Sequence, residues 1–414
     1  MLQGEVSPGA FLFVRNIAPY VILLHRDPCL EQMRRNTGSL PHPVTDSTKA
    51  GWRHVTRWTV PDCQTASAGG LDPAESTVAP DLNPISEPPV LRIAHQPAIE
   101  MSGFQYQKWT VSEPYVDVPG TLLEGPFHDK TRNEFRFVDI WEQKLYVLDL
   151  AKGPDSLKIM DTSASIGVTA NIANAGDSRE NQIVVAAKHG FALVDRTTGA
   201  LSYIQKVWDD PAKEHRMRFN DGAVDSHGRF WAGAMNDPKV QNPVNEGVIF
   251  RLDPDMKLHR MVEQVTIPNG IGWNPADDTM YLTDSPTGKI YAFDFDAETG
   301  NISNRRVFFD IGEPKEPDGF AIDEEGCIWS AIYGGGKVIR ISPEGKVIGE
   351  ITFPTRNITC PVFVGTELFI TTAKDDTNDD QLPESVRYGG RLYRVDVGIK
   401  GKPKNEFRLE GCPQ

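Results

Sequence analysis

Three tight-turn motifs follow one another at a constant spacing, and this repeat constrains the fold more than any other feature of the chain. The motifs Asn220-Asp221-Gly222, Pro268-Asn269-Gly270 and Pro317-Asp318-Gly319 place Asn220, Asn269 and Asp318 at steps of 49 residues. A fixed period of this length is typical of stacked or radial repeats. We therefore expect each repeat to form one blade of a β-propeller, with equivalent positions pointing at the same central channel.

A pair of strand-like segments recurs along the chain and predicts the number of blades. Each segment is rich in β-branched and aromatic residues and is bounded by Gly, Asp or Pro, which is the signature of a strand. The first members are 135–139, 183–187, 229–233, 279–284, 327–331 and 368–372, and the second members are 144–149, 190–195, 247–253, 289–294, 337–342 and 391–396. Because helical patterns are almost absent, the prediction is an all-β, six-bladed β-propeller. We expect a strand within 106–118 to close the ring on the C-terminal blade, which would leave no unpaired sheet edge.

The first 100 residues differ in composition from the rest and are predicted to lie outside the propeller. Residues 64–100 are rich in Pro, Ala, Ser and Thr, and such a segment cannot bury enough apolar surface to offset its ordering entropy. We interpret residues 1–100 as a largely disordered N-terminal extension and residues 101–414 as the propeller. The alternative is that Met101 is the true start and that the extension is a gene-model or isoform feature.

The net charge and the cysteine content indicate which partners and which cellular compartment to expect. The net charge of −14 and the isoelectric point of about 5.2 argue against nucleic acid or an anionic membrane as a partner. The five cysteines are scattered and form no Cys-x-x-Cys pair, which favours a reducing, cytoplasmic compartment. No apolar stretch is long enough to span a bilayer. We expect a monomer or a weak homo-oligomer.

Four oxygen-bearing side chains fall at related phases of the repeat and are candidate metal ligands. Glu124 lies 96 residues before Asn220, close to two further repeats, so we expect Glu124, Asn220, Asn269 and Asp318 to converge. Two carboxylates and two amides form a hard oxygen set that suits Ca²⁺, Mg²⁺ or Mn²⁺. So few protein ligands would leave positions open for water and substrate. The alternative is that each Asx-Gly unit is only a tight turn, facing solvent instead of the channel.

Arg218 is a candidate substrate contact. It stands two residues before Asn220, so strand alternation places both side chains on one face. A cationic side chain would repel a metal ion, and we therefore predict that Arg218 holds substrate oxygens; the alternative is an ordinary surface arginine. The sequence contains no Gly-x-Ser-x-Gly elbow, phosphate-binding loop or dinucleotide fingerprint.

The chain from about Gly120 to Arg394 resembles the gluconolactonase/regucalcin (senescence marker protein) family. The resemblance rests on several motifs that occur together and in order. They are Leu123-Glu124-Gly125-Pro126, Arg218 to Asp225 (RFNDGAVD), Gly228 to Gly233 (GRFWAG), Pro268-Asn269-Gly270-Ile271, Tyr281 to Ser285 (YLTDS), Pro317-Asp318-Gly319 and Gly335-Gly336-Lys337-Val338. One departure is that Phe127-His128 stand where the family commonly has a Trp.

This resemblance implies a six-bladed β-propeller with one divalent metal ion in its channel. It implies that Glu124, Asn269 and Asp318 bind the metal, and that Arg218 and Asn220 contact the substrate, with Asn220 close to the metal. Ca²⁺ is the expected ion, with Zn²⁺, Mg²⁺ and Mn²⁺ as alternatives. Members of the family hydrolyse sugar lactones such as gluconolactone, so a sugar lactone is the expected small-molecule partner.

The combined prediction is metal-dependent hydrolysis of a sugar lactone to the aldonic acid. The metal is expected to polarise the lactone carbonyl and to stabilise the oxyanion, and Asp318 to act as general base for the attacking water. Two alternatives stay open: hydrolysis of another ester or of a phosphotriester on the same scaffold, and a non-catalytic calcium-binding propeller. The polar channel residues argue against the second alternative, because a pure scaffold would not need them.

Overall fold

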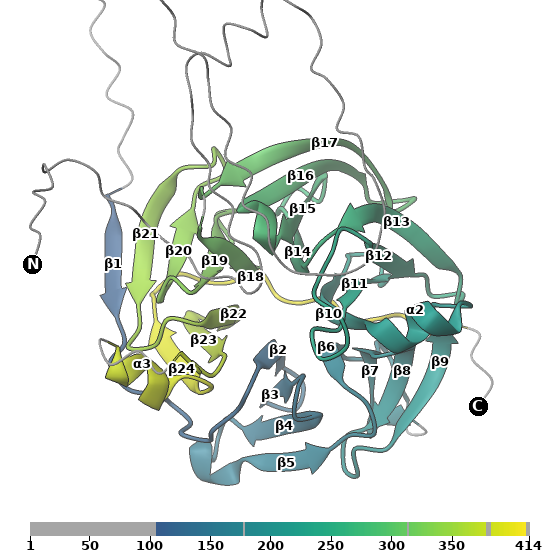
Figure 1. Ribbon diagram of the computed structural model, residues 1–414, viewed down its shortest axis with the longest axis horizontal. Coiled ribbons are helices and arrows are strands. Elements are labelled where there is room, and N and C mark those ends of the chain that lie inside the picture. Colours follow the sequence, from purple (N-terminus) through teal and green to yellow (C-terminus); the bar gives the residue numbers. More distant parts are fainter. Residues whose placement is uncertain (1–104, 177–178, 313, 378–381, 411–414) are drawn as a thin grey trace, which may run out of the picture. The chain divides into compact units, whose positions relative to one another are not determined.

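The fold of this chain is a mostly β, six-bladed propeller. The computed structural model describes residues 105–176, 179–312, 314–377 and 382–410. The predicted N-terminal extension, residues 1–100, lies outside the described residues. The described sheets are arranged around a common axis, with one innermost strand from each sheet facing that axis (Figure 1). No helix in the described part of the chain is long and apolar enough to cross a membrane.

The blades follow chain order, and each strand pairs antiparallel with the next, from the axis outward. Blade 1 consists of β2 (Leu123–Asp129), β3 (Glu134–Asp139), β4 (Lys144–Asp149) and β5 (Lys158–Asp161). Blade 2 consists of β6 (Ile166–Ala170), β7 (Gln182–Ala187), β8 (Gly190–Asp195) and β9 (Leu201–Lys206). Blade 3 consists of β10 (Met217–Val224), β11 (Phe230–Asn236), β12 (Gly247–Leu252) and β13 (Leu258–Val265). Blade 4 consists of β14 (Pro268–Trp273), β15 (Thr279–Asp284), β16 (Lys289–Asp296) and β17 (Asn301–Asp310). Blade 5 consists of β18 (Glu316–Ile322), β19 (Ile328–Tyr333), β20 (Lys337–Ile341) and β21 (Val347–Thr352). Blade 6 consists of β22 (Ile358–Val364), β23 (Glu367–Thr372) and β24 (Leu392–Asp396). The two predicted segments of each repeat are the second and third strands of each blade, so this part of the prediction is confirmed.

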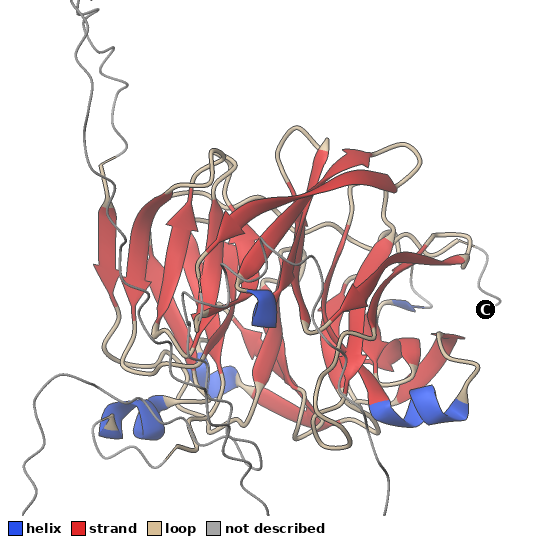
Figure 2. Ribbon diagram, turned by 45° about the horizontal axis from the view of Figure 1, so that its top comes forward, coloured by secondary structure: helices blue, strands red, loops and turns tan. Residues whose placement is uncertain are grey.

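Two short α-helices among the described residues make the fold mostly β instead of all-β. Helix α2 (Pro211–Arg216) joins blades 2 and 3, and α3 (Pro383–Tyr388) lies between β23 and β24. Helix α2 begins where a helix is favoured, because the Asp210 carboxylate accepts a hydrogen bond from the Ala212 amide at 2.9 Å and Pro211 follows the cap. Figure 2 shows both α-helices on the same side of the ring of strands.

The ring closes at blade 6 in a way that the sequence predicted only in part. Val116 forms an antiparallel bridge with Leu392 of β24, and the Val116 amide donates to the Leu392 carbonyl at 3.1 Å. This pairing agrees with the expected closure of the C-terminal blade by an N-terminal segment. The earlier part of the predicted range behaves differently, because β1 (Gln107–Thr110) pairs in parallel with β21 on the outer edge of blade 5.

After β24 the chain crosses the channel at the end where the innermost strands finish. The Lys402 amide donates to the Ile322 carbonyl of blade 5 at 2.8 Å, and the Phe407 amide donates to the Asn171 carbonyl of blade 2 at 2.9 Å. Phe407 is fully buried. We call residues 401–409 the floor strap. The end of the channel that the floor strap crosses is called the floor, and the opposite end is called the mouth.

Apolar clusters hold neighbouring blades together and fix the innermost strands in place. Between blades 3 and 4, the ring centroid of Trp231 lies 5.9 Å from that of Trp273 and 6.3 Å from that of Phe295. Between blades 5 and 6, Trp329 packs edge-on against Phe363 with centroids 6.0 Å apart. Buried aromatic pairs of this kind add specific geometry to the area that they bury, so the channel walls are set by packing behind them.

Candidate functional site

The innermost strand of each blade is irregular at the same level, and the candidate site lies at this level. On each of these strands the pairing with the second strand skips a residue. The shifts fall between Glu124 and Phe127, Ile166 and Val168, Phe219 and Gly222, Pro268 and Ile271, Pro317 and Phe320, and Ile358 and Cys360. A β-bulge kinks its strand and re-aims the side chain of the unpaired residue. The regularly spaced Asx-Gly units are therefore bulges of the innermost strands.

The structure brings the four predicted oxygen-bearing residues together. Glu124, Asn220, Asn269 and Asp318 come from β2, β10, β14 and β18, and all are buried, with exposed fractions of 4 to 5 %. The Asn220 side-chain amide donates to the carbonyl of Pro268, the residue before Asn269, at 3.0 Å. The alternative of solvent-facing turns is excluded by this burial.

Three buried carboxylates at this level, those of Glu124, Asp221 and Asp318, influence one another's charge. Burial, followed by the charge of Asp221, raises the pKa of Glu124 to about 8. Burial, followed by the charges of Glu124 and Asp221, raises the pKa of Asp318 well above its usual value, and burial raises the pKa of Asp221. No Lys, Arg or His in the described ranges forms an ion pair with any of the three. Like charges in a buried site disfavour ionisation, so the site has a strong electrostatic demand for a cation.

The oxygens left without a partner fit a hard divalent cation. The Asn269 amide nitrogen donates to Ser285 Oγ at 2.9 Å, whereas Asn269 Oδ1 is buried and has no hydrogen-bond partner among the described residues. Glu124 accepts from the Gly125 amide at 3.3 Å through one oxygen, and Asp318 accepts from the Gly319 amide at 3.0 Å through one oxygen. Each carboxylate therefore keeps a second oxygen. Carboxylate and amide oxygens are the ligands that Ca²⁺ prefers.

Arg218 and Asn220 form a unit beside these carboxylates. Arg218 Nη1 donates to Asn220 Oδ1 at 2.8 Å and to the Phe219 carbonyl at 2.9 Å. Both ends of the Asn220 amide are thus held by protein groups. Arg218 Nε is buried and has no hydrogen-bond partner in the described part. Burial lowers the pKa of Arg218 to about 10, so the side chain stays cationic at neutral pH and has a donor left for another molecule.

Several residues of the site were not predicted from the sequence. Asp221 stands inside the first Asx-Gly motif, and Ser285 ends the Tyr281 to Ser285 motif, so both were next to recognised signals. Tyr333 lies close to the carboxylates. Burial raises the pKa of Tyr333 to about 12, and the negative charge of Asp318 is the next largest cause of this rise. Lys404 of the floor strap also reaches this region, since its charge lowers the pKa of both Glu124 and Asp221. No local pattern marks residue 404.

Another acidic group could be taken for a metal site and is instead neutralised by the protein. Potential ligand atoms of Asp323, Glu325 and Cys327 lie within 4.8 Å of one another. The Asp323 carboxylate accepts from Trp329 Nε1 at 2.9 Å and from Arg340 Nη2 at 2.8 Å, and Arg340 Nη2 also donates to Glu325 at 2.6 Å. These contacts satisfy the charge of the group, so it is a structural cluster.

Comparisons with known proteins point in the same direction as the geometry. The model of the SMP-30/gluconolactonase/LRE-like region matches residues 122–374. Regucalcin of Xenopus laevis is 33 % identical over 305 residues, which cover 72 % of this chain and 96 % of that protein. A 6-deoxy-6-sulfogluconolactonase of Pseudomonas putida is 31 % identical over 291 residues, which cover 69 % of this chain and 94 % of that protein. The crystal structure of a calcium-binding regucalcin from Agrobacterium tumefaciens superposes with a TM-score of 0.66 at 26 % identity, covering 73 % of this chain and 99 % of that one.

Proposed function

Because the chain belongs to the SMP-30/gluconolactonase/regucalcin family, we propose that it is a metal-dependent hydrolase of sugar lactones whose active site is at the mouth of the channel. The observation that carries this proposal is the group of three buried carboxylates without a counter-ion, next to the unpartnered Oδ1 of Asn269. Glu124, Asn269 and Asp318 would hold the ion. We expect Ca²⁺, with Mg²⁺, Mn²⁺ and Zn²⁺ as alternatives.

The chemistry needs a polarised carbonyl and a positioned base. A bound divalent cation would act as a Lewis acid toward the lactone carbonyl. Asp318 is the candidate general base, because it would lie beside the ion and keeps one carboxylate oxygen that accepts no hydrogen bond from a described residue. In the proposed reaction it takes a proton from the attacking water. It then returns the proton to the ring oxygen as the ring carbon–oxygen bond breaks, giving the aldonic acid.

Arg218 and Asn220 are proposed to orient the substrate. Arg218 already fixes the Asn220 amide at 2.8 Å, so the two side chains present a preorganised polar surface. The free donor at Arg218 Nε suits a carbonyl or hydroxyl oxygen of a lactone. Fixed donors reduce the entropy lost when the substrate reaches its reactive position.

The partner proposed for this site is a neutral small molecule. A net charge of −14 gives little attraction for nucleic acid or an anionic membrane.

Hydrolysis of another ester or of a phosphotriester is the alternative reaction. The same ligands would also serve a protein that only binds calcium, and a turnover assay separates that alternative from a hydrolase.

The test is lactone hydrolysis by the full chain, followed with a pH indicator over a panel of aldonolactones. The assay is run as isolated, after chelation, and after Ca²⁺, Mg²⁺, Mn²⁺ or Zn²⁺ is restored. We expect turnover that chelation removes and that at least one ion restores. A folded protein that binds the ion but hydrolyses none of the lactones would overturn the proposal, and activity on aryl esters or phosphotriesters alone would favour the alternative reaction.

A further inference from the structure

A side chain of blade 6 reaches blade 1 where the ring closes, and we call this junction the seam. Thr359 lies in β22, where the pairing with β23 skips from Ile358 to Cys360. Its hydroxyl donates to the carbonyl of Leu123, the residue before Glu124, at 2.6 Å. The hydrogen bond therefore holds the peptide unit that leads into Glu124, a proposed metal ligand.

Thr359 is itself fixed in place by its surroundings. It is fully buried, as is Thr371 of β23, and the two hydroxyl oxygens are 2.8 Å apart. Thr371 Oγ1 also donates to the Cys360 carbonyl at 3.1 Å. On the other side of the seam, β2 is the innermost strand of blade 1, so one of its edges has no partner strand in the described sheets. A carbonyl on such an edge needs a donor from elsewhere in the protein, and Thr359 supplies one to Leu123.

The same contact occurs on the opposite side of the ring. Asn220, at the bulge of blade 3, donates to the carbonyl of Pro268, the residue before Asn269, at 3.0 Å. Blades 3 and 6 face each other across the axis of a six-bladed ring, as do blades 1 and 4 (Figure 1). Thr359 and Asn220 are therefore equivalent in position and in hydrogen bonding, and each holds the peptide before a proposed metal ligand in the next blade.

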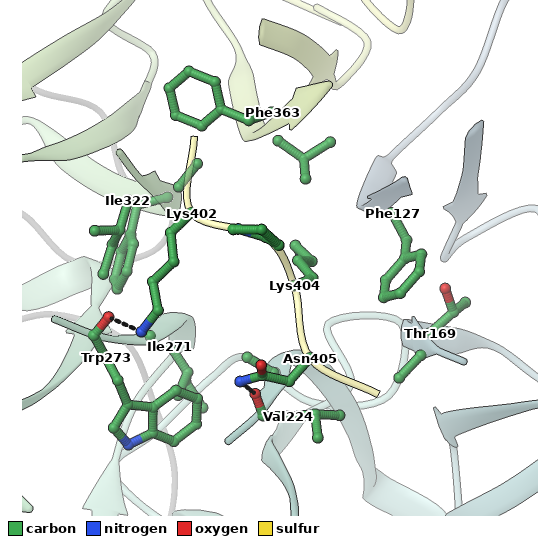
Figure 3. A pocket seen from close by; sticks show the side chains of 18 residues that line it. Phe127, Thr169, Val224, Ile271, Trp273, Ile322, Phe363, Lys402, Lys404 and Asn405 are labelled. Carbon is green, nitrogen blue, oxygen red and sulfur yellow. Dashed lines mark hydrogen bonds between the residues drawn. The ribbon is translucent and has the colours of Figure 1, made fainter. Parts of the chain in front are cut away.

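The seam decides how far Glu124 lies from the other proposed ligands. Blades 1 and 6 come from the two ends of the propeller, so non-covalent contacts hold them together. Toward the floor, Phe127 of blade 1 and Phe363 of blade 6 line a cavity of about 80 Å³, which the floor strap crosses in Figure 3. Glu124 in blade 1 and Asp318 in blade 5 lie on the two sides of blade 6. Their separation therefore depends on contacts such as that of Thr359.

We propose that Thr359 is a positioning residue of the metal site, which holds Glu124 in place across the seam, so that cation binding and closure of the ring stabilise each other. This inference rests on the proposed metal site and assigns a role in it to blade 6, from which no ligand is proposed. A fixed peptide at Leu123 preorganises the Glu124 carboxylate, and less freedom is then lost when a cation binds. Conversely, a cation held by Glu124, Asn269 and Asp318 would link blade 1 to blades 4 and 5 and oppose opening of the seam.

The first test compares two buried threonines of blade 6 by calcium affinity and does not rely on turnover. Thr359→Val removes the hydroxyl that reaches blade 1. Thr372→Val is the matched control, because Thr372 is equally buried and donates to the Arg391 carbonyl at 2.8 Å, just before β24. In calorimetric titrations of the chelator-treated full chain, we expect the Kd for Ca²⁺ to rise about 10–100-fold in Thr359→Val and to stay within about threefold of the wild type in Thr372→Val. Thr359→Ser keeps the hydroxyl and should bind as the wild type does.

The second test measures the seam in the wild type. The Lys374 amide donates to the Thr121 carbonyl at 2.9 Å, and the Gly120 amide donates to the Gly390 carbonyl at 2.8 Å, both across the seam. Hydrogen exchange of the full chain is followed by mass spectrometry with and without saturating Ca²⁺. We expect Ca²⁺ to slow exchange about tenfold or more in peptides that contain these two amides. Peptides from β7 and β8 of blade 2, from which no ligand is proposed, should change less.

The outcomes separate this inference from the metal site on which it rests. Thr359→Val that binds Ca²⁺ as tightly as Thr372→Val would overturn the role of Thr359 and leave the metal site standing. A wild type that binds none of Ca²⁺, Mg²⁺, Mn²⁺ and Zn²⁺ would overturn both. The coupling is also overturned if Ca²⁺ slows exchange at the seam no more than in blade 2, and this measurement still decides the question if Thr359→Val does not fold.

Discussion

Two groups of buried carboxylates lie at different levels of the same channel wall, and only one of them is neutralised by the protein. Toward the floor, the Asp225 carboxylate accepts from Arg229 Nε at 2.6 Å and from Trp231 Nε1 at 2.9 Å. Asp323 occupies the equivalent position in blade 5 and accepts from Trp329 Nε1 at 2.9 Å and from Arg340. Both carboxylates are fully buried.

Toward the mouth, Glu124, Asp221 and Asp318 are almost as deeply buried, yet no described cationic side chain pairs with them. A buried charge is costly unless it is paired or bound to a metal. The two levels therefore differ in how their charge is balanced: protein groups form direct ion pairs and hydrogen bonds with the floor carboxylates, whereas Glu124 and Asp221 at the mouth are near the charges of Arg218 and Lys404 without pairing with them. This difference separates a structural use of buried charge from a functional one.

The largest effect is expected when a mouth carboxylate is changed. Asp318→Asn should lower the rate of gluconolactone hydrolysis by about a thousandfold or more, because it removes both a metal ligand and the proposed base. The metal-free variant should be at least as stable as the metal-free wild type, since one unpaired buried charge is gone. Initial rates and thermal unfolding in a chelator measure the two outcomes. A variant that keeps its rate within tenfold of the wild type would contradict the role of Asp318.

A floor carboxylate should show the opposite balance. Asp323→Ala leaves Arg340 and the Trp329 indole N–H unpaired, so the free energy of unfolding should fall by about 3–5 kcal/mol. Ca²⁺ affinity of the folded fraction should stay within about threefold of the wild type. Urea unfolding and calorimetric titration test this, and Asp225→Ala is the matched substitution in blade 3. A variant that is as stable as the wild type but has lost Ca²⁺ binding would break the comparison between the two levels.

The level of the mouth site could be predicted from the sequence because it is repeated. Asn220, Asn269 and Asp318 share one phase of a 49-residue period. The structure places each of them at the equivalent bulge of its own innermost strand. Glu124 is close to this phase but not in it, since it pairs with Val138 at the edge of its bulge. Strand periodicity specifies which blade position a residue takes, and a one-residue offset is within what a bulge can absorb.

Residues that reach the channel by tertiary crossing could not be predicted in the same way. Lys404 belongs to a segment without strand alternation, and its place depends on bonds of the strap to blades 2, 3 and 5. The contact between Arg218 and Asn220 could not be predicted either, because a pattern of alternation does not reveal that the Arg218 side chain holds Asn220. Such contacts depend on how distant segments pack, and local propensity carries no signal for them.

A smaller effect is expected when Ser285, which orients the proposed metal ligand Asn269, is changed. Ser285→Ala removes the hydroxyl that accepts from the Asn269 amide nitrogen at 2.9 Å, and Asn269 Oδ1 would lose its fixed orientation. We expect Ca²⁺ affinity to fall about 10–100-fold, as is usual for groups that orient metal ligands, with little change in kcat at saturating Ca²⁺. Calcium dependence of the rate measures both. Ser330→Ala is the control, because this buried hydroxyl donates to the Ala331 carbonyl at 3.2 Å; equal losses in the two variants would refute the orienting role.

The smallest expected effect tests whether pairing alone, and not the level in the channel wall, decides the behaviour of a carboxylate. Glu246 accepts from Arg216 Nε and Nη2, both at 2.9 Å, and from the Asn236 amide at 2.6 Å. The hydrogen bonds from Arg216 lower its pKa from 4.5 to about 2. A lowered folded-state pKa means that the stabilisation is complete above pH 4.5 and is lost as the pH falls toward 2. Glu246→Gln should therefore lower the free energy of unfolding by about 1 kcal/mol at neutral pH, and the difference from the wild type should shrink steadily in urea unfolding at pH 4 and below. A difference that stays constant across that range would mean that the charge of Glu246 contributes nothing to stability, and the contrast between paired and unpaired carboxylates would then not extend to partly exposed groups.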